Sequence, residues 1–212
     1  MKVTDRIDLR NCDNMDLMAQ YPDNYFDLAI VDPPYGIERF KKGGSFINKY
    51  GSNDRLWNNI KPRQEYFNEL FRVSKNQIIW GANNFELPPS EYFLCWNKEQ
   101  AMQNFATLEY AWVSMGLKKP AKLFTYSIHK HNQSTKVHPT QKPVELYSYI
   151  LENYAKEGDK ILDTHLGSGS IAIACHYRGF ELVGCELDEE YYSQMLERFR
   201  KETAQLSLLG DL

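Results

Sequence analysis

The sequence predicts an α/β fold in which a mostly parallel sheet, with an antiparallel pair at one edge, is covered by helices on both faces. Three observations lead to this prediction. Short apolar runs alternate with amphipathic stretches, which is typical of parallel strands joined by helices. Two of those runs, 27–32 and 160–163, end in an aspartate. The chain has 212 residues, of which 42% are hydrophobic, and this suits one domain with a sizeable core.

The N-terminal part of the chain shows two strands and two helices by local pattern. Residues 5–13 alternate polar and apolar positions and predict a short strand, and residues 16–21 predict a short helix that Pro22 ends. An apolar run predicts a buried strand over 27–32. Residues 65–73 place large apolar side chains on one side of a helix, which predicts that this helix packs against the sheet.

The middle of the chain is expected to complete one side of the sheet. Short apolar runs predict buried strands over 77–80 and 92–96. Residues 108–115 and 123–126 carry the aromatic and aliphatic side chains typical of strands. We expect these two segments to pair with each other, antiparallel and near the sheet edge. They would form the antiparallel edge hairpin of the predicted fold.

The last part of the chain predicts two more strands, each followed by a helix. Proline at the first position suits a helix over 143–155. Strands are expected over 160–163 and 181–186, with a helix over 170–177 between them. A final helix over 189–206 has charged residues spaced to face solvent. Ligands of such sheets bind beyond the carboxyl ends of the strands, so those ends are where functional residues are expected.

Charge is distributed unevenly along the chain. Residues 36–63 are rich in glycine and asparagine and predict a long mobile loop, and they carry seven basic and two acidic side chains. Residues 118–142 carry six lysines and no acid, although the whole chain has a net charge of −3. The pattern predicts a basic face on an acidic body, which suits nucleic acid. Lysines that only solvate surface loops are the alternative.

Other features narrow the class of protein. No run of eighteen apolar residues predicts a membrane span, and residues 1–6 lack the apolar core of a signal peptide. The four cysteines are dispersed without C-x-x-C spacing, at Cys12, Cys95, Cys175 and Cys185. This favours free thiols in a reducing cytoplasm over a disulfide framework. The pair His129 and His131 has no acid or cysteine nearby in the sequence, so no metal site is predicted.

The most informative motif is Asp32-Pro33-Pro34-Tyr35, which directly follows an apolar run. Two prolines after a strand often only end it, since neither donates to a ladder. An acid and an aromatic ring at the carboxyl edge of a sheet also offer a hydrogen-bond acceptor and a flat stacking surface, between which a planar amine fits. Both interpretations, an ordinary turn and an amine-binding site, stay open from these residues alone.

A second motif follows the strand expected over 160–163. The turn after it contains Asp163, Gly167, Ser168 and Gly169. The glycines let the backbone approach a ligand closely, and Glu186, at the end of the next strand, is placed to hold both hydroxyls of a ribose. Together these residues predict a nucleoside cofactor. A nicotinamide dinucleotide site shares this plan, and Ala172 at the third glycine position is compatible with it.

The two motifs, in this order, resemble those of amino-methylating DNA methyltransferases, specifically the N6-adenine enzymes of the permuted β group. In that group the Asp-Pro-Pro-Tyr element precedes the turn that binds S-adenosylmethionine (SAM). The segments His138-Pro139-Thr140-Gln141-Lys142-Pro143 and Cys12-Asp13-Asn14 also resemble motifs of the family. The similarity spans nearly the whole chain. One departure is Asp163-Thr164-His165, where the family usually reads Asp-Pro-Phe.

The resemblance implies a Rossmann-like SAM-dependent methyltransferase fold, with residues 1–212 as a single catalytic domain. It implies transfer of a methyl group from SAM to the N6 amine of an adenine flipped out of double-stranded DNA. Residues 36–63 would be a DNA-side loop that orders when DNA binds, and residues 97–137 would supply the sheet edge and a small target-recognition region. It implies a cytoplasmic protein and allows a cognate restriction nuclease as partner.

The resemblance also assigns roles to individual residues. The catalytic set is Asp32, Pro33, Pro34 and Tyr35. The carboxylate of Asp32 and the carbonyl of Pro33 would accept the two hydrogens of the amine, and Tyr35 would stack on the base. The cofactor set is Asp13, Thr140, Lys142, Asp163, Gly167, Ser168, Gly169 and Glu186. Within it, Glu186 would hold the ribose and Asp13 the adenine amine of SAM. The DNA-binding set is Arg39, Lys41, Lys42, Lys49, Lys130 and Lys136.

Alternatives remain at this stage. An N4-cytosine enzyme more often carries serine as the first residue of the motif, so Asp32 favours adenine without excluding cytosine. A catalytically inactive SAM-binding or DNA-binding module is the alternative from a different class, and the presence of Asp32, Tyr35 and Glu186 favours an enzyme. For Lys142 the alternative is an ordinary lysine at the start of a helix.

Overall fold

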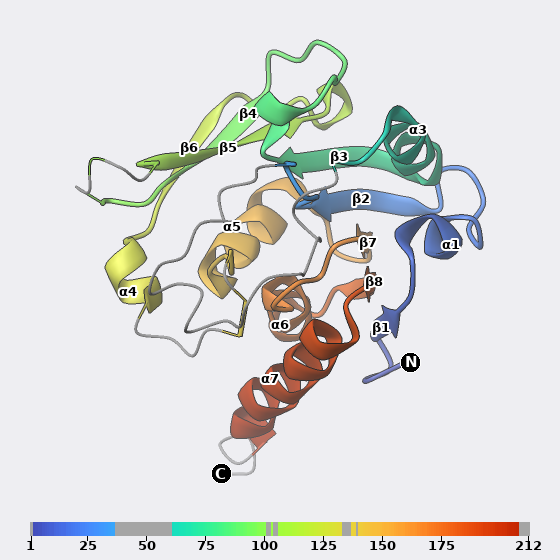
Figure 1. Cartoon of the computed structure of the whole chain (residues 1–212), viewed down its shortest axis with the longest axis vertical. Helices are drawn as coiled ribbons and strands as arrows, with labels where there is room; N and C mark the ends of the chain where they lie inside the picture. The colour runs from blue at the N-terminus through green and yellow to red at the C-terminus, as the bar shows by residue number, and fades with distance from the viewer. Residues whose placement is uncertain are drawn as a thin grey trace.

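A computed structural model describes residues 2–36, 61–100, 103, 106–132, 137–138 and 140–207. Within these ranges the strands are β1 (Ile7–Asn11), β2 (Phe26–Val31), β3 (Ser74–Trp80), β4 (Phe93–Asn97), β5 (Leu108–Val113), β6 (Lys122–Thr125), β7 (Lys160–Asp163) and β8 (Glu181–Glu186). They form one sheet in the order β1-β8-β7-β2-β3-β5-β4-β6 (Figure 1). The predicted α/β fold class, mostly parallel with an antiparallel part, is confirmed.

The α-helices of the described ranges follow the predicted pattern closely. They are α1 (Asn14–Met18), α3 (Gln64–Val73), α4 (Ile128–Asn132), α5 (Val144–Tyr154), α6 (Ser170–Arg178) and α7 (Glu189–Ser207). Of these, α4 was not predicted, because its five residues are too few to show a helical period. Two short 3₁₀ turns, Ala82–Asn84 and Met115–Leu117, were also not predicted.

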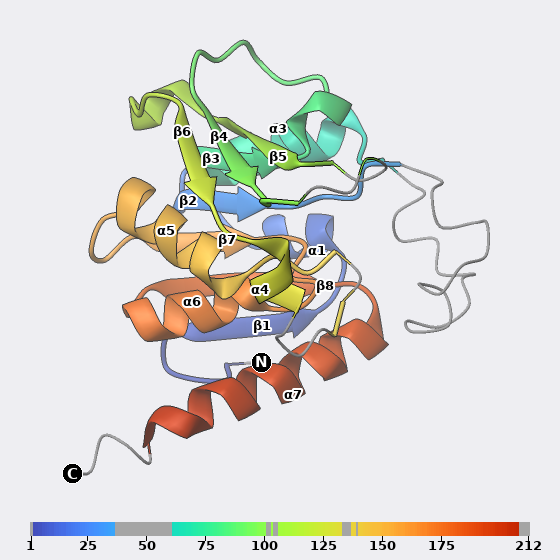
Figure 2. The same cartoon turned by 90° about the vertical axis from the view of Figure 1, so that its left-hand side faces the viewer.

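Helices cover both faces of the sheet, as Figure 2 shows. Alternate side chains of β2 point to opposite faces, because the side-chain period of a strand is two. Leu28 and Ile30 belong to a core shared with α5, α6 and α7. Ala29 and Val31 belong to the core shared with α1 and α3. The strand is therefore apolar from Leu28 to Val31, as expected for a parallel strand that is buried on both sides.

The predicted antiparallel pairing of 108–115 with 123–126 is wrong. The antiparallel partner of β5 within the hairpin is β4, and β6 pairs with β4 in parallel. The reason is that both edges of β5 are occupied, one by β4 and the other by β3. The free edge of β4 is where β6 forms its hydrogen bonds, and β6 becomes the outermost strand.

The parallel strands bring distant residues to one edge of the sheet. Leu28 of β2 lies beside Ile161 of β7, and Asp163 of β7 lies beside Gly184 of β8. The carboxyl ends of β2, β7 and β8 therefore meet, and the residues that follow them face a common space. No helix in the described part of the chain is long and apolar enough to cross a membrane. All four cysteines are free thiols, as the sequence predicted.

Candidate active site at the carboxyl edge of the sheet

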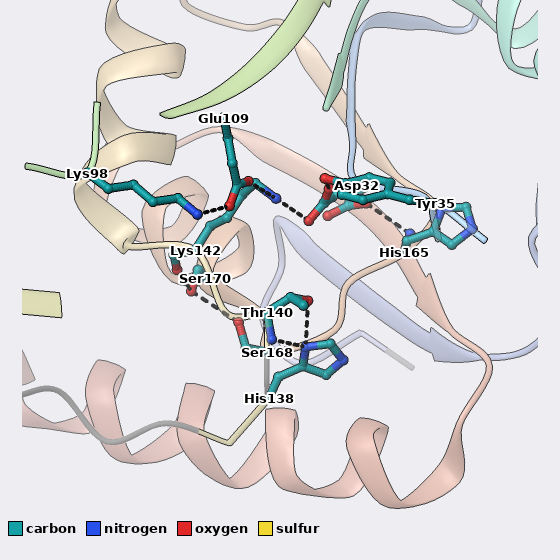
Figure 3. Close-up of polar contacts among 11 residues, drawn as sticks. Asp32, Tyr35, Lys98, Glu109, His138, Thr140, Lys142, His165, Ser168 and Ser170 are labelled. Atoms are coloured by element: carbon teal, nitrogen blue, oxygen red, sulfur yellow. Dashed lines mark hydrogen bonds and ion pairs between the residues drawn. The ribbon is translucent and has the colours of Figure 1, made fainter. Parts of the chain in front are cut away.

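A cavity of about 800 Å³ opens where these strands end. Seven of the residues predicted as catalytic or cofactor-binding line it, namely Asp32, Pro34, Thr140, Lys142, Gly167, Ser168 and Glu186. Some lie at or after the ends of β2, β7 and β8, and the others lie in the segment that precedes α5. They are therefore far apart in the sequence. The two predicted motifs therefore form one site, and Figure 3 shows the polar contacts at its centre.

Asp32, the first residue after β2, accepts hydrogen bonds from two side chains. The hydroxyl of Tyr35 donates to Oδ1 at 2.5 Å, and the ammonium of Lys142 donates to Oδ2 (Figure 3). Burial and the Asp32 carboxylate raise the pKa of Tyr35, so its hydroxyl stays protonated and remains a donor. Pro33 is buried directly after Asp32 and Pro34 lines the cavity. The motif therefore presents a carboxyl group whose two oxygens are both engaged by the chain itself.

The conformation of Tyr35 depends on a glycine that the sequence did not single out. Gly81, which follows β3, has a φ of +65°, and a Cβ placed on it would lie 2.1 Å from the Tyr35 ring. A side chain at this position would overlap the ring. Gly81 thus leaves the space in which Tyr35 reaches Asp32. The signal that could have found it is a glycine directly after a buried strand.

Lys142 joins the two halves of the site. Its carbonyl accepts a hydrogen bond from Ser170 Oγ at 2.7 Å, at the start of α6, and its side chain reaches Asp32. The side chain is only 3% exposed and lies 5.2 Å from the centre of the Trp80 ring. Burial alone would lower the pKa of Lys142, but the carboxylates of Asp32 and Glu109 outweigh it and raise that pKa. The interpretation of Lys142 as an ordinary helix-start lysine is wrong, because its ammonium is buried against an acid.

Glu109 is the other anion beside this ammonium, and sequence reasoning missed it. It lies on β5, with Oε2 at 3.0 Å from Lys142 Nζ and Oε1 at 2.5 Å from Lys98 Nζ. Burial alone would raise the pKa of Glu109, but the ammonium groups of Lys142 and Lys98 lower it to about 2. The four side chains form a row of alternating charge, Lys98, Glu109, Lys142 and Asp32 (Figure 3). Nothing local in the sequence around Glu109 pointed to this contact.

The glycine-containing turn is held by Glu186 at the end of β8. Glu186 Oε2 accepts the backbone N–H of Gly167 at 2.8 Å, and Oε1 accepts that of Asp188 at 3.0 Å. Gly167 and Gly169 have φ values of +49° and +72°, a region that favours glycine. Both predicted glycines therefore serve the turn conformation.

Arg198 of α7 donates hydrogen bonds to the same turn, and it was not predicted. It is 6% exposed, and its Nη1 donates to the carbonyl of Ser168 and to Ser170 Oγ, both at 2.9 Å. Its Nε donates to Glu202 at 2.7 Å, which compensates the buried charge. Arg198 directly precedes Phe199 on the buried side of α7. An arginine inside the apolar stripe of the final helix is the signal that would have found it.

Asp163 is buried behind the turn at 2% exposure. Its Oδ1 accepts the backbone N–H of His165 at 2.9 Å. Burial, together with the negative charges of Asp32 and Glu186, raises the pKa of Asp163 to about 8. At neutral pH this carboxyl group is therefore largely protonated, and its charge changes as the pH passes through about 8.

The position where the family usually has phenylalanine carries His165 in this chain. Its Nδ1 lies 2.9 Å from Thr164 Oγ1 and its Nε2 lies 3.2 Å from the side-chain nitrogen of Asn14. The ring packs edge-on against Tyr66, with ring centres 5.3 Å apart. Burial lowers the pKa of His165 to about 4, so the ring is neutral. His165 thus keeps an uncharged ring in the cavity wall.

Two other predicted residues have contacts that the sequence did not indicate. The carboxylate of Asp13 accepts the backbone N–H of Met15 at 2.7 Å and caps α1. The backbone N–H of Thr140 donates to Nδ1 of His138, and the hydroxyl of Thr140 lies within hydrogen-bond distance of the same nitrogen. Burial lowers the pKa of His138 to about 3. Lys130 is exposed on α4. Of the remaining DNA-binding set, Arg39, Lys41, Lys42, Lys49 and Lys136 lie outside the described residues, as does most of the segment 36–63.

Comparison with known families identifies the family of this chain. A family model described as DNA methylase, of the N6/N4 methyltransferase type, matches residues 76–197, which is more than half of the chain. The chain belongs to this family. The match confirms the expected family, and it does not distinguish the N6-adenine β group from N4-cytosine enzymes.

Two curated relatives are similar over parts of their length. The Type II methyltransferase M.HpaI of Haemophilus parainfluenzae is 33% identical over 84 residues, which is 39% of this chain and 27% of the relative. The Type II methyltransferase M.BglII of Bacillus subtilis is 21% identical over 243 residues, covering 85% of this chain and 65% of the relative. The chain therefore spans less than two thirds of the length of each of these proteins.

Solved structures confirm the fold. The crystal structure of an M1.HpyAVI–SAM complex matches with a TM-score of 0.61 at 18% identity, covering 91% of this chain and 99% of that one. The cytosine-N4-specific PvuII DNA methyltransferase matches with a TM-score of 0.61 at 13% identity, covering 95% of this chain and 91% of that one. At such identities the likeness supports the architecture of this DNA methylase family member.

Proposed function

We propose that this chain transfers a methyl group from SAM to the exocyclic amine of a base flipped out of double-stranded DNA, and that this amine is N6 of adenine. The observation that carries the proposal is the position of Asp32. Its carboxyl group lies at the cavity wall that also holds the turn of Gly167 and Glu186. An amine acceptor and a nucleoside-binding turn thus share one cavity, in a chain of the DNA methylase family.

The residues present fit SAM. The cavity of about 800 Å³ falls within the range of small-molecule sites. Glu186 provides a carboxylate for the ribose hydroxyls, and Gly167 and Ser168 line the wall where the remainder would lie. Asp32 supplies negative potential for a cationic ligand, and Asp163 adds to it above about pH 8, where its carboxyl group ionises. When bound, SAM supplies an activated methyl group.

The chain's own residues would orient and activate the amine. The lone pair of an exocyclic amine is delocalised into the base ring, so the nitrogen is a poor nucleophile. A hydrogen bond from the amine to the Asp32 carboxylate, with a second to the carbonyl of Pro33, would localise that lone pair and fix the nitrogen for in-line attack. We propose that Tyr35 contributes by stacking on the base, after its hydroxyl leaves Asp32.

N4 of cytosine is the second candidate target. The structural likeness to a cytosine-N4-specific enzyme favours it, and Asp32 can accept hydrogen bonds from either amine. The aspartate at the first motif position favours adenine. A catalytically inactive binding module is disfavoured by the arrangement of Asp32 and Lys142, since a buried ion pair is costly to keep without a use.

Expression in a methylation-free bacterial host tests the function directly. Single-molecule sequencing of the host DNA is expected to show N6-methyladenine within a defined sequence. The Asp32→Ala variant, expressed at the same level, serves as the matched control and should leave the DNA unmodified. N4-methylcytosine in place of N6-methyladenine would favour the second candidate. Absence of both modifications would contradict the proposed activity.

We further propose that residues 1–212 act as one catalytic domain in the cytoplasm. Residues 97–137 would provide the sheet edge and a small target-recognition region, and this region already reaches the active site through Glu109. The DNA-binding role of the two basic segments also remains part of this proposal.

SAM affinity is expected to rise with pH through about 8, because the pKa of Asp163 is raised to that value. Below this pH Asp163 is protonated and gives a cation no charge partner, so SAM binding there releases a proton. Calorimetry in buffers of different ionisation enthalpy measures that proton. The Asp163→Asn variant is the control, because the amine of SAM itself titrates near pH 8. Equal pH dependence in both proteins would contradict the assignment.

DNA affinity is expected to fall steeply with salt, because lysines and arginines that contact phosphates release counterions. Lys61 and Arg63, which belong to the basic segment 36–63, line the cavity. Replacing both with glutamine is expected to reduce the log–log salt slope by about 2, at about 0.9 for each phosphate contact. Fluorescence anisotropy with a labelled duplex measures the slope. Lys156→Gln and Lys201→Gln together form the control, since these lysines lie away from the cavity lining.

A further inference from the structure

The Asp32 carboxylate presents a problem for the proposed reaction. Both of its oxygens already accept hydrogen bonds from the chain, Oδ1 from Tyr35 and Oδ2 from Lys142. Each carboxylate oxygen has two lone-pair sites. When the hydroxyl of Tyr35 leaves Asp32, a target amine can donate to Oδ1, but the ammonium on Oδ2 still competes with it for the negative charge of the carboxylate. Lys142 is a buried ammonium, and such a group loses much free energy if it loses its anion.

Glu109 offers the ammonium a second anion without any large movement. Its Oε2 is buried and lies 3.0 Å from Lys142 Nζ, at ion-pair distance but without hydrogen-bond geometry. A short shift of Nζ toward β5 would complete that hydrogen bond. The same shift would free Oδ2 of Asp32 while Lys142 stays paired.

Lys98 holds the receiving carboxylate in place. Lys98 Nζ lies 2.5 Å from Oε1 of Glu109, on the side away from Lys142. Lys98 follows β4 and Glu109 lies on β5, and these strands are hydrogen-bonded neighbours in which Trp96 pairs with Glu109. Glu109 is therefore fixed by backbone pairing and by an ion pair, and only its Oε2 remains available to the active site.

We propose that Glu109 is a positioning residue that takes over the ammonium of Lys142 when the target amine donates to Asp32. This inference rests on the proposed amino-methyltransferase function and adds a residue to it. Charge is conserved in this exchange of ion-pair partners, because one ammonium moves between two carboxylates and the exchange itself transfers no proton. Asp32 exchanges a lysine N–H for an amine N–H.

Loss of the Glu109 charge should therefore slow the reaction without weakening SAM binding. In Glu109→Gln the ammonium of Lys142 has Asp32 as its only anion, and the amine must compete with it. We expect the single-turnover rate to fall by about tenfold to a hundredfold, the range for one hydrogen bond to a charged group. SAM affinity should change by less than about threefold, because Glu109 lies outside the cofactor turn. The conservative variant Glu109→Asp should restore part of the rate.

The experiment uses the full chain, tritiated SAM and saturating unmethylated genomic DNA from a methylation-free host. Single-turnover rates, calorimetric SAM affinity and melting temperature are measured for the parent, Glu109→Gln and Glu109→Asp. Glu145→Gln is the matched control, because this nearby carboxylate on α5 accepts a hydrogen bond from Tyr126 at 2.8 Å. It takes no part in the charged row, so its rate should equal that of the parent.

A second variant keeps the inference testable if Glu109→Gln folds poorly. Lys98→Met removes the group that holds Oε1 and should slow turnover by a smaller factor of about threefold. In a double-mutant cycle it should cause no further loss once Glu109 is neutral. Additive effects of the two substitutions would show that Lys98 and Glu109 act independently, and this would overturn the inference that the charged row acts as a unit.

The outcomes separate the inference from the function. A parent that methylates DNA while Glu109→Gln keeps the parent rate overturns the inference and leaves the function intact. A rate loss matched by equal losses of SAM affinity and melting temperature, without recovery in Glu109→Asp, shows a merely structural role and also overturns it. A parent that binds SAM but modifies no DNA contradicts the proposed function itself, and the inference with it.

Discussion

Replacing Asp32 with alanine is expected to abolish methyl transfer while SAM binding is retained. In the proposed reaction the carboxylate would act on the reacting amine, and its hydrogen bond would strengthen as charge develops on the nitrogen in the transition state. The loss of one such preorganised group costs about 10²–10³-fold in turnover. Incorporation of tritium from labelled SAM into DNA measures the effect, with calorimetry for SAM affinity in parallel.

Two comparisons make this test specific. Asp32→Asn keeps the shape of the side chain and removes its charge, so it separates charge from geometry. Asp5→Ala removes an exposed carboxylate outside the site and should leave the rate unchanged. If Asp32→Ala retained activity within about threefold of the parent, Asp32 would be a turn residue only. In the alanine variant Lys142 still has Glu109 as its anion, so the protein is expected to fold.

Replacing Glu186 with alanine is expected to weaken SAM binding by about tenfold to a hundredfold, corresponding to about 1.5–3 kcal/mol for hydrogen bonds to a charged group. The carboxylate has two uses in this structure. It would accept the ribose hydroxyls, and it accepts the N–H groups of Gly167 and Asp188 that shape the turn. Its loss removes a ligand contact and also loosens the turn. Isothermal calorimetry with SAM measures the change.

The same strand supplies the control for this prediction. Glu181 lies at the opposite end of β8 and is exposed, so Glu181→Ala should bind SAM as the parent does. Glu186→Gln keeps the shape of the side chain, but it removes the charge and replaces one acceptor oxygen with an NH₂ donor. We expect its SAM affinity to lie between those of the parent and Glu186→Ala. Unchanged SAM affinity in Glu186→Ala would exclude the ribose assignment.

Much of the site was predictable because its residues follow apolar runs. Asp32, Asp163 and Glu186 each stand at the end of a buried strand, and parallel strands end at the same sheet edge. The positive φ values of Gly167 and Gly169 likewise follow from the need of the turn for glycine. These are short-range properties, in which neighbours along the chain determine the conformation.

The residues that were missed act through contacts between distant segments. Arg198 reaches the turn at Ser168 from the last helix, and Gly81 leaves space for a ring 46 positions earlier in the chain. Lys142 was predicted to contact the cofactor, and the structure places its ammonium on Asp32. None of these pairings leaves a periodic signal, because each depends on which elements pack together.

The sequence by itself determined most of the strands and helices, the order of the two motifs and the edge of the sheet at which they meet. Side-chain period and turn chemistry operate over a few residues, so they can be read along the chain. Only the tertiary structure decided that β5 lies between β3 and β4, which occupy both of its edges and leave β6 the free edge of β4. That placement carries Glu109 to Lys142. The order of strands depends on which distant segments pair at each sheet edge, so it cannot be read from neighbours along the chain. This order places the charged groups of Glu109 and Lys142 beside Asp32.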